Sequence, residues 1–164
     1  MSDALDWFNV LPADQAEDLL YACFANQAWA MRLTAGRPYH DLSDLMKAAD
    51  SAWSELSEAD WLGAFAAHPR IGERGGHAPA TSEREQSRVM QSSEATLRAL
   101  AAENREYEAH FGYIFLISAA GRGAKEVLAE LRLRMKNEPT TELKVAADEQ
   151  RKITRLRLEK LLNR

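Results

Sequence analysis

The chain has 164 residues, 46% of them hydrophobic, which suits one domain, residues 1–164, with a substantial apolar core. The net charge of −4, with both signs interspersed, gives no basic surface of the kind that binds nucleic acid or anionic lipid. No apolar run could span a bilayer, and Asp3 and Asp6 stand where a signal peptide would be basic. With a single cysteine, Cys23, and no peroxisomal address at the C-terminus, we expect a cytoplasmic protein.

Residues that favour helices dominate the composition. Glycine (8) and proline (5) are scarce, whereas Ala, Leu, Glu and Arg are abundant. No segment alternates convincingly with a period of two. We therefore expect an all-α fold, a single-domain bundle of about seven or eight helices.

Hydrophobic periodicity predicts these helical segments, in chain order: Pro12–Ala25, Gln27–Thr34, Leu42–Ala52, Glu58–Ala67, Glu83–Glu108, Tyr113–Ala120, Ala124–Lys136 and Glu142–Leu162. Residues expected to cap helix N-termini are Asp41, Ser57, Ser82 and Thr141. Residues expected to end helices are Gly36, Pro69, Gly121 and Pro139. A stretch with three glycines and a proline, Gly72–Thr81, resembles a linker but is too short to separate two domains.

His68 is a candidate for acid/base chemistry. It follows the predicted helix Glu58–Ala67 and precedes Pro69, which cannot continue a helix. The partial negative charge at a helix C-terminus favours the imidazolium and suits proton transfer near neutral pH. The alternative is a capping histidine with no further role.

Ser82, Glu85 and Gln86 share one face at the start of the predicted helix Glu83–Glu108. Farther along the helix this face becomes apolar and turns inward, so its polar end could line a pocket. The alternative is a capping box, in which Ser82 and Glu85 only close the helix start.

The most apolar run is Phe111–Gly121, whose length suits a buried helix and a buried strand equally. It is expected to form core, and its small residues could present backbone amides to a ligand.

Arg157 falls on the inward face of the last predicted helix, whereas Arg155 falls on another side. The other residues of this inward stripe are Leu143, Ala146, Ala147, Gln150, Ile153, Thr154, Leu158 and Leu161. A buried arginine stays charged and needs an anionic partner, which could be Glu85 or the carboxylate of a ligand. The alternative is an arginine whose head reaches solvent. The excess of Lys and Arg after residue 144 indicates a solvated helix face.

Metal and nucleotide sites are not indicated. The remaining histidines, His40, His77 and His110, lack zinc-like spacing, and the glycines of Gly72–Gly76 lack the strand–loop–helix context of a phosphate loop.

Four motifs together resemble the OHCU decarboxylase family, whose substrate is 2-oxo-4-hydroxy-4-carboxy-5-ureidoimidazoline (OHCU). They are His68-Pro69-Arg70-Ile71-Gly72, Ser82-x-x-Glu85-Gln86, Phe111-Gly112-Tyr113-Ile114-Phe115 and Lys152-Ile153-Thr154-x-Leu156-Arg157-Leu158. The resemblance implies an all-helical homodimer that converts OHCU, a small molecule, to (S)-allantoin. This is the last step from urate, and it uses no metal or other cofactor.

The resemblance also implies roles for individual residues. His68 would be the catalytic acid/base, Glu85 would orient the substrate, and Arg157 would anchor an anionic or carbonyl oxygen. The residues expected to contact substrate are Pro69, Ser82, Glu85, Gln86, Arg157 and the backbone at Ile117, Ser118 and Ala119.

Two other functions compete with this hypothesis. The chain could be a hydrolase that uses Ser82 with His68 and Glu85, although no Gly-x-Ser-x-Gly motif presents the serine. It could also be a helical interaction module whose polar motifs are only caps. A large exposed apolar groove would favour the module.

Overall fold

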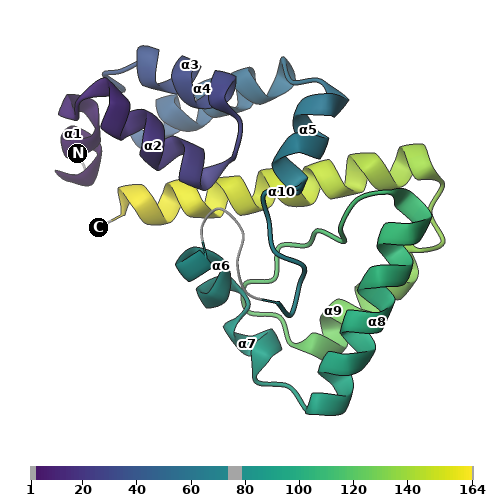
Figure 1. The fold of residues 1–164 in the computed structure, drawn as a ribbon. Coiled ribbons are helices and arrows are strands. Elements are labelled where there is room, and N and C mark those ends of the chain that lie inside the picture. Colours follow the sequence, from purple (N-terminus) through teal and green to yellow (C-terminus); the bar gives the residue numbers. More distant parts are fainter. Residues whose placement is uncertain (1–2, 74–78, 164) are drawn as a thin grey trace. The chain divides into compact units, whose positions relative to one another are not determined.

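The computed structural model describes residues 3–73 and 79–163, and every regular element in this part of the chain is a helix. The described residues form ten helices and no strand, which confirms the all-α prediction, and Figure 1 shows their arrangement within each unit. They are α1 (Asp3–Val10), α2 (Ala13–Cys23), α3 (Gln27–Ala35), α4 (Leu42–Ser54), α5 (Glu58–Phe65), α6 (Pro79–Glu85), α7 (Ser87–Met90), α8 (Glu94–Phe111), α9 (Ala124–Arg134) and α10 (Pro139–Leu162). Among these helices, none is long and apolar enough to cross a membrane.

The chain folds into two compact units. The first unit comprises Met1–Ala64 and Ile153–Arg164, and the second unit comprises Phe65–Lys152. Helix α10 therefore contributes its N-terminal part to the second unit and its C-terminal part to the first.

Helices α2 to α4 form most of the first unit, with α2 against α3 and α3 against α4 (Figure 1). Its core includes Leu20, Phe24 and Trp29, and Leu158 and Leu162 from the end of α10 complete it. Burial of these apolar side chains is the main source of stability for the unit.

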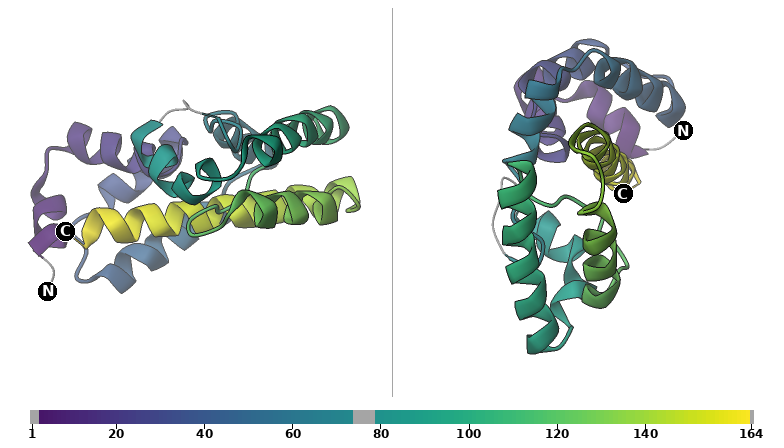
Figure 2. Two further views of the ribbon diagram at one scale, coloured as in Figure 1. Left: turned by 90° about the horizontal axis from the view of Figure 1, so that it is seen from below. Right: turned by 90° about the vertical axis from the view of Figure 1, so that its right-hand side faces the viewer.

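In the second unit, α8 and α9 run side by side in both Figure 1 and Figure 2, and α7 contacts α9. Val89, Leu100, Tyr107 and Leu131 are buried in the core of this unit. The core lies between the helices and the segment that joins α8 to α9.

Six of the predicted helices are confirmed, with ends that differ by up to three residues, as α2, α3, α4, α5, α9 and α10. Two predicted N-caps are also confirmed. The backbone amide of Asp44 donates to Oδ1 of Asp41 over 2.8 Å, and that of Asp60 donates to Oγ of Ser57 over 3.2 Å. Gly36 caps the C-terminus of α3, as predicted.

The predicted long helix Glu83–Glu108 is wrong, because the chain there forms α6, α7 and α8. Ser82 lies inside α6, so its prediction as a cap is wrong too. The true cap is Ser93, whose Oγ accepts from the backbone amide of Thr96 over 3.3 Å and starts α8. A serine that bonds nearby backbone amides competes with a continuous helix.

Residues 114–119 form no helix, so the helix predicted over Tyr113–Ala120 is wrong. Gly112 ends α8 in the left-handed conformation, with φ +87°, and the chain leaves the helix there. The predicted helix end at Gly121 therefore has no helix before it, and this glycine lies in a turn with φ +76°.

Helix α10 begins at Pro139, which was predicted to end a helix, so Thr141 lies inside α10 rather than capping it. Proline suits the first turn of a helix, because the amide that it lacks has no intrahelical partner there. Helix α1 was not predicted from the sequence. Residues 74–78 of the linker-like stretch, including His77, lie outside the described residues.

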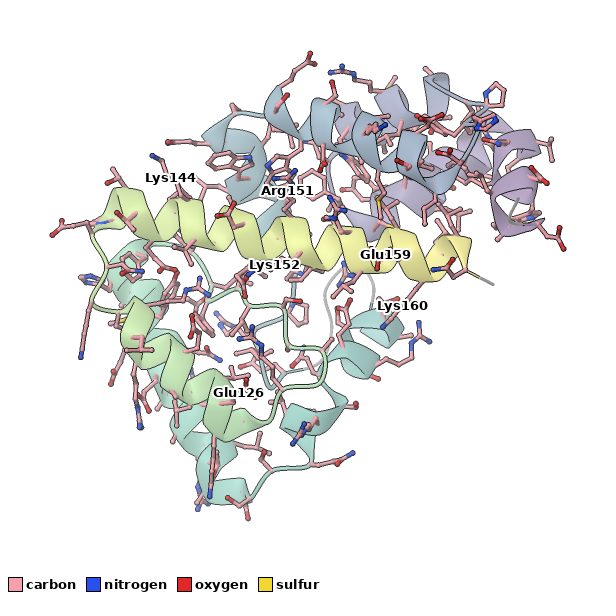
Figure 3. The ribbon with its side chains drawn as sticks, turned by 180° about the vertical axis from the view of Figure 1, so that it is seen from behind. Glu126, Lys144, Arg151, Lys152, Glu159 and Lys160 are labelled. Atoms are coloured by element: carbon pink, nitrogen blue, oxygen red, sulfur yellow. The ribbon has the colours of Figure 1, made fainter. Side chains whose placement is uncertain are left out.

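Most of the charged side chains labelled in Figure 3 lie along α10, whereas Glu126 lies on α9. The labelled side chains on α10 are exposed or half-buried, as predicted for a solvated helix face. Those on α10 are Lys144, Arg151, Lys152, Glu159 and Lys160.

Candidate functional site

His68 lies in a tight turn just beyond the C-terminus of α5. Its backbone amide donates to the carbonyl oxygen of Phe65, the last residue of α5, over 3.1 Å. The imidazole is half-buried, and its Nε2 lies 2.7 Å from Oε1 of Gln150 in α10. The predicted position at a helix end is confirmed, and a hydrogen bond orients the ring.

Helix α8 holds the next residues of this turn. The Nδ2 of Asn104 donates to the carbonyl oxygen of Ile71 over 2.9 Å. The Nε of Arg70 donates to a carboxylate oxygen of Glu108 over 2.8 Å, and the side chain of Ile71 is buried in the core of the second unit. The His-Pro-Arg-Ile-Gly motif is thus fixed by both its backbone and its side chains.

Gln86 connects the turn to the segment predicted to bind substrate. Its Oε1 accepts from the backbone amide of Gly72 over 2.7 Å, and the φ of Gly72 is +87°. Side chains with a Cβ rarely adopt this conformation, which explains the glycine of the motif. Because the oxygen of Gln86 is occupied, its amide nitrogen is the end that can donate to a ligand.

Ser82 is buried inside α6, and Glu85 is half-buried at the last residue of the same helix. The predicted capping box is wrong, since Ser82 does not stand at the helix start. Its position in a regular helix also lacks the sharp turn that presents the nucleophile of a serine hydrolase, so the structure does not favour that function.

A cavity of about 240 Å³ opens beside Gln86 in the second unit. Its lining residues come from the end of the His-Pro turn and from α6 and α7: Glu73, Glu83, Gln86, Ser87 and Met90. One member of the predicted substrate-binding set therefore borders an open space.

Ile117, Ser118 and Ala119 lie in the irregular segment between α8 and α9. Ile117 and Ala119 are buried in the core of the second unit. The half-buried Ser118 donates its backbone amide to Oε1 of Glu149 over 3.3 Å. A ligand that used this amide would have to replace the carboxylate of Glu149.

A buried ion pair anchors the same segment. The guanidinium of Arg134 donates to Glu142 over 2.6 Å and to the carbonyl oxygen of Leu116 over 2.7 Å, and it lies 4.5 Å from the centroid of the Phe115 ring. The hydroxyl of Tyr107 also donates to Glu142. Burial, together with this hydrogen bond to a carboxylate, raises the pKa of Tyr107 far above its usual range. Leu116 belongs to no helix or strand, so this ion pair, rather than a regular element, holds its backbone in place.

Arg157 lies in the part of α10 that belongs to the first unit, and it is only 4% exposed. Its Nη1 lies 3.4 Å from the carbonyl oxygen of Ala22, within hydrogen-bond distance. The predicted inward position is confirmed, and the alternative in which the head of Arg157 reaches solvent is wrong.

Among the described residues, one group has side chains close enough to hold a metal ion. It consists of His40, Asp41 and Asp44, which are all exposed and lie in the first unit. The Oδ1 of Asp41 already caps α4 through the amide of Asp44. That hydrogen bond also lowers the pKa of Asp41. The group is explained as a helix cap, and none of its members belongs to the predicted site.

The second unit contains His68, Pro69, Ser82, Glu85, Gln86, Ile117, Ser118 and Ala119, and the first unit contains Arg157. Two residues in this region were missed from the sequence, Gln150 beside His68 and Glu149 beside Ser118. Gln150 lies on the predicted inward stripe of the last helix, and a polar residue on that stripe was the one signal that could have indicated it. Nothing in the local sequence indicates Glu149.

The model of the OHCU decarboxylase family matches residues 9–159 of the chain. The uric acid degradation bifunctional protein of Arabidopsis thaliana is 35% identical over 153 residues, which make up 90% of this chain and 47% of that protein. The 2-oxo-4-hydroxy-4-carboxy-5-ureidoimidazoline decarboxylase of Haloferax volcanii is 26% identical over 156 residues, or 94% of this chain and 93% of that protein. The chain thus spans about half the length of the Arabidopsis protein and nearly all of the Haloferax protein.

The fold is similar to a crystal structure of OHCU decarboxylase in the presence of (S)-allantoin. The TM-score is 0.80 and the sequence identity 35%, over 90% of this chain and 99% of that one. The matched range includes all four motifs on which the resemblance was first based, from the His-Pro turn to the Leu-Arg-Leu of α10. The chain belongs to the OHCU decarboxylase family.

Proposed function

We propose that this chain decarboxylates OHCU to (S)-allantoin in urate degradation. The observation that carries the proposal is the similarity of fold and sequence to a solved OHCU decarboxylase over 90% of the chain. That protein was crystallised in the presence of (S)-allantoin, which is the product proposed for this chain.

The substrate carries its own electron sink, so the proposed reaction needs no cofactor. When the bond between C4 and the carboxylate breaks, CO₂ leaves and the electron pair forms a double bond between C4 and C5. The former C5=N bond gives its pair to nitrogen, which takes a proton. The C4 hydroxyl then loses its proton and becomes the carbonyl, while C5 gains a proton on one face. The protein has to orient the carboxylate, stabilise the moving charge and deliver the proton to C5.

His68 is the residue that we propose for this proton transfer. An imidazole changes its protonation state near neutral pH, which suits a general acid/base. The ring is half-buried and held by a hydrogen bond to Gln150, and a fixed ring can deliver a proton from one side. Delivery from one side would give one enantiomer of allantoin.

Glu85, Gln86 and Ser82 are proposed to orient the substrate, with Glu85 acting on the hydroxyl or ureido group. Gln86 supports this role, because its oxygen is bonded to Gly72 and its amide nitrogen can donate to a substrate oxygen. Pro69 is proposed as a further substrate contact by its match to the His-Pro motif of the family. The backbone at Ile117–Ala119 is proposed as a contact because it belongs to the apolar segment that continues the Phe-Gly-Tyr-Ile-Phe motif.

Arg157 is proposed to anchor an anionic or carbonyl oxygen of the substrate. The proposal rests on the match of Leu156-Arg157-Leu158 to the family motif and on the burial of Arg157. A buried guanidinium remains charged and offers a planar fork of donors that fits a carboxylate.

We further propose that residues 1–164 act as one domain, as a homodimer and in the cytoplasm. The family model supports the first point, because its match includes residues of both units. The dimer is proposed from the family resemblance, and light scattering of the purified protein would test it.

Freshly generated OHCU is the decisive substrate for testing the function. With the protein present, CO₂ release should be faster than the spontaneous reaction, and a circular-dichroism signal of (S)-allantoin should develop in parallel. His68→Asn is the matched variant, and it should keep the helical spectrum while kcat falls by about 10²–10⁴. A chelator should leave the rate of the native protein unchanged.

Two results would count against the proposal. Without faster CO₂ release and optical activity, the decarboxylase function fails and the interaction module becomes the leading hypothesis. Unchanged turnover in His68→Asn would instead remove only the histidine from the mechanism.

A further inference from the structure

We infer that Gln150 is a positioning residue, which fixes the tautomer and the orientation of the His68 imidazole. This inference rests on the proposed function, because it concerns the histidine proposed to transfer the proton. The juxtaposition is long-range in sequence, since α10 brings Gln150 to a histidine 82 residues earlier in the chain.

The environment of Gln150 explains why a glutamine at this position needs a partner. Gln150 is 0% exposed, and the neighbouring positions of the same helix stripe are the buried, apolar Ala146, Ala147 and Ile153. A buried amide costs free energy unless it is hydrogen-bonded, whereas an apolar side chain would suit this stripe at no such cost. The 2.7 Å contact with His68 gives the amide oxygen of Gln150 its bond.

The chemistry of the contact determines the protonation of the ring. An amide oxygen only accepts hydrogen bonds, so Nε2 of His68 must carry the proton that it donates to Gln150. In the neutral imidazole the other nitrogen, Nδ1, then holds the lone pair. Gln150 thereby makes Nδ1 the basic nitrogen of His68.

The neutral amide differs in one respect from the carboxylate that orients the histidine of a serine protease triad. A carboxylate both fixes the tautomer and stabilises the imidazolium by its charge. Gln150 fixes the tautomer without a negative charge, so it orients His68 but does not add the stabilisation that a carboxylate gives to the imidazolium.

Nitrogen-15 NMR of the histidine rings tests the contact directly. Histidine-labelled full-length protein should show a His68 ring with its proton on Nε2, and the His68→Asn variant assigns the signal. Gln150→Leu removes the acceptor at similar volume, and it should give a mixture of tautomers. Gln150→Glu keeps an oxygen acceptor in place, and it should retain the proton on Nε2.

Kinetics with OHCU form the second part of the test. Gln150→Leu should lower kcat by about tenfold to a hundredfold, the usual effect of removing a partner that orients a functional side chain, with little change in KM. Ala147→Gly is the matched control, because it weakens the same helix about one turn away and leaves the contact intact. It should change neither the tautomer nor kcat.

The inference is overturned if the native ring carries its proton on Nδ1, or if Gln150→Leu changes neither the tautomer nor kcat. It is also overturned if Gln150→Leu and Ala147→Gly lower kcat equally with unchanged tautomers, because helix destabilisation would then explain the loss. Should Gln150→Leu fail to fold, a changed tautomer in the folded Gln150→Glu variant would overturn it. The NMR result does not depend on OHCU turnover. An inactive native protein whose tautomer responds to Gln150→Leu would refute the proposed function and support the contact.

Discussion

Arg157→Lys should weaken substrate binding although it keeps the charge, because lysine lacks the planar fork of donors. Loss of one hydrogen bond to a charged group costs about 1.5–3 kcal/mol, which corresponds to a rise in KM of about tenfold or more. Steady-state kinetics with OHCU would measure the change. Arg155→Lys is the control, because Arg155 is exposed and pairs with Asp50 at 3.3 Å, and its KM should stay unchanged. Equal KM values for both variants would contradict the anchoring role.

Helical periodicity predicts that Arg157 faces inward, because an arginine on an apolar stripe is a local anomaly, and its burial confirms this. The same stripe contains Gln150, but the partner of Gln150 lies in a distant turn. A long-range pair leaves no spacing pattern in the sequence, so the contact of His68 with Gln150 could not be predicted.

At the scale of elements, the sequence predicted the helices that have clear apolar stripes and failed where side chains bond the backbone. Ser93 interrupts an otherwise continuous helical pattern by capping α8. In the segment after Gly112, β-branched and aromatic residues indicated a buried element but not its type. Its backbone bonds to Arg134 and Glu149, two residues from later helices, so local propensity could not predict its conformation.

Ser93→Ala should lower the free energy of unfolding by about 1 kcal/mol, since the first turn of α8 loses its cap. Thr141→Ala is the control, because Thr141 lies exposed inside α10 and alanine is the better helix former. Urea denaturation of both variants would measure the difference. If Thr141→Ala cost as much as Ser93→Ala, the corrected helix starts would be wrong.

Glu142→Ala should be far more destabilising, by about 3–5 kcal/mol, because it leaves the buried guanidinium of Arg134 without its carboxylate. Arg132, which also lies in α9, offers the comparison, because it pairs with Glu103 of α8 at 2.8 Å in a more exposed position. Glu103→Ala should cost no more than about 1 kcal/mol. Urea denaturation monitored by circular dichroism distinguishes the two, and similar losses would show that burial of the first pair has no energetic weight.

For the whole molecule, composition and periodicity were enough to predict the all-α class, whereas the division into two units was not predicted. Helix α1 was also missed, since its short segment buries only Ala4, Leu5 and Phe8 and has no long stripe. The first unit is discontinuous, because it combines residues 1–64 with residues 153–164. Such a unit can be predicted only if it is known which distant segments of the chain pack together. The hydrophobic pattern shows that α10 has an apolar face, but it does not show that the two halves of this helix belong to different units.

That discontinuity has a consequence for the order in which the newly made chain can fold on the ribosome. N-terminal regions generally fold first during synthesis, because they emerge first. Here Leu158 and Leu162 complete the core that contains Leu5 and Leu20, so the earliest helices cannot finish folding until the end of α10 has emerged from the ribosome. Residues 65–152 emerge before that point and can form their own core. The first-made part of the chain is therefore the last to be completed, and its apolar surface is open to chaperones in the meantime.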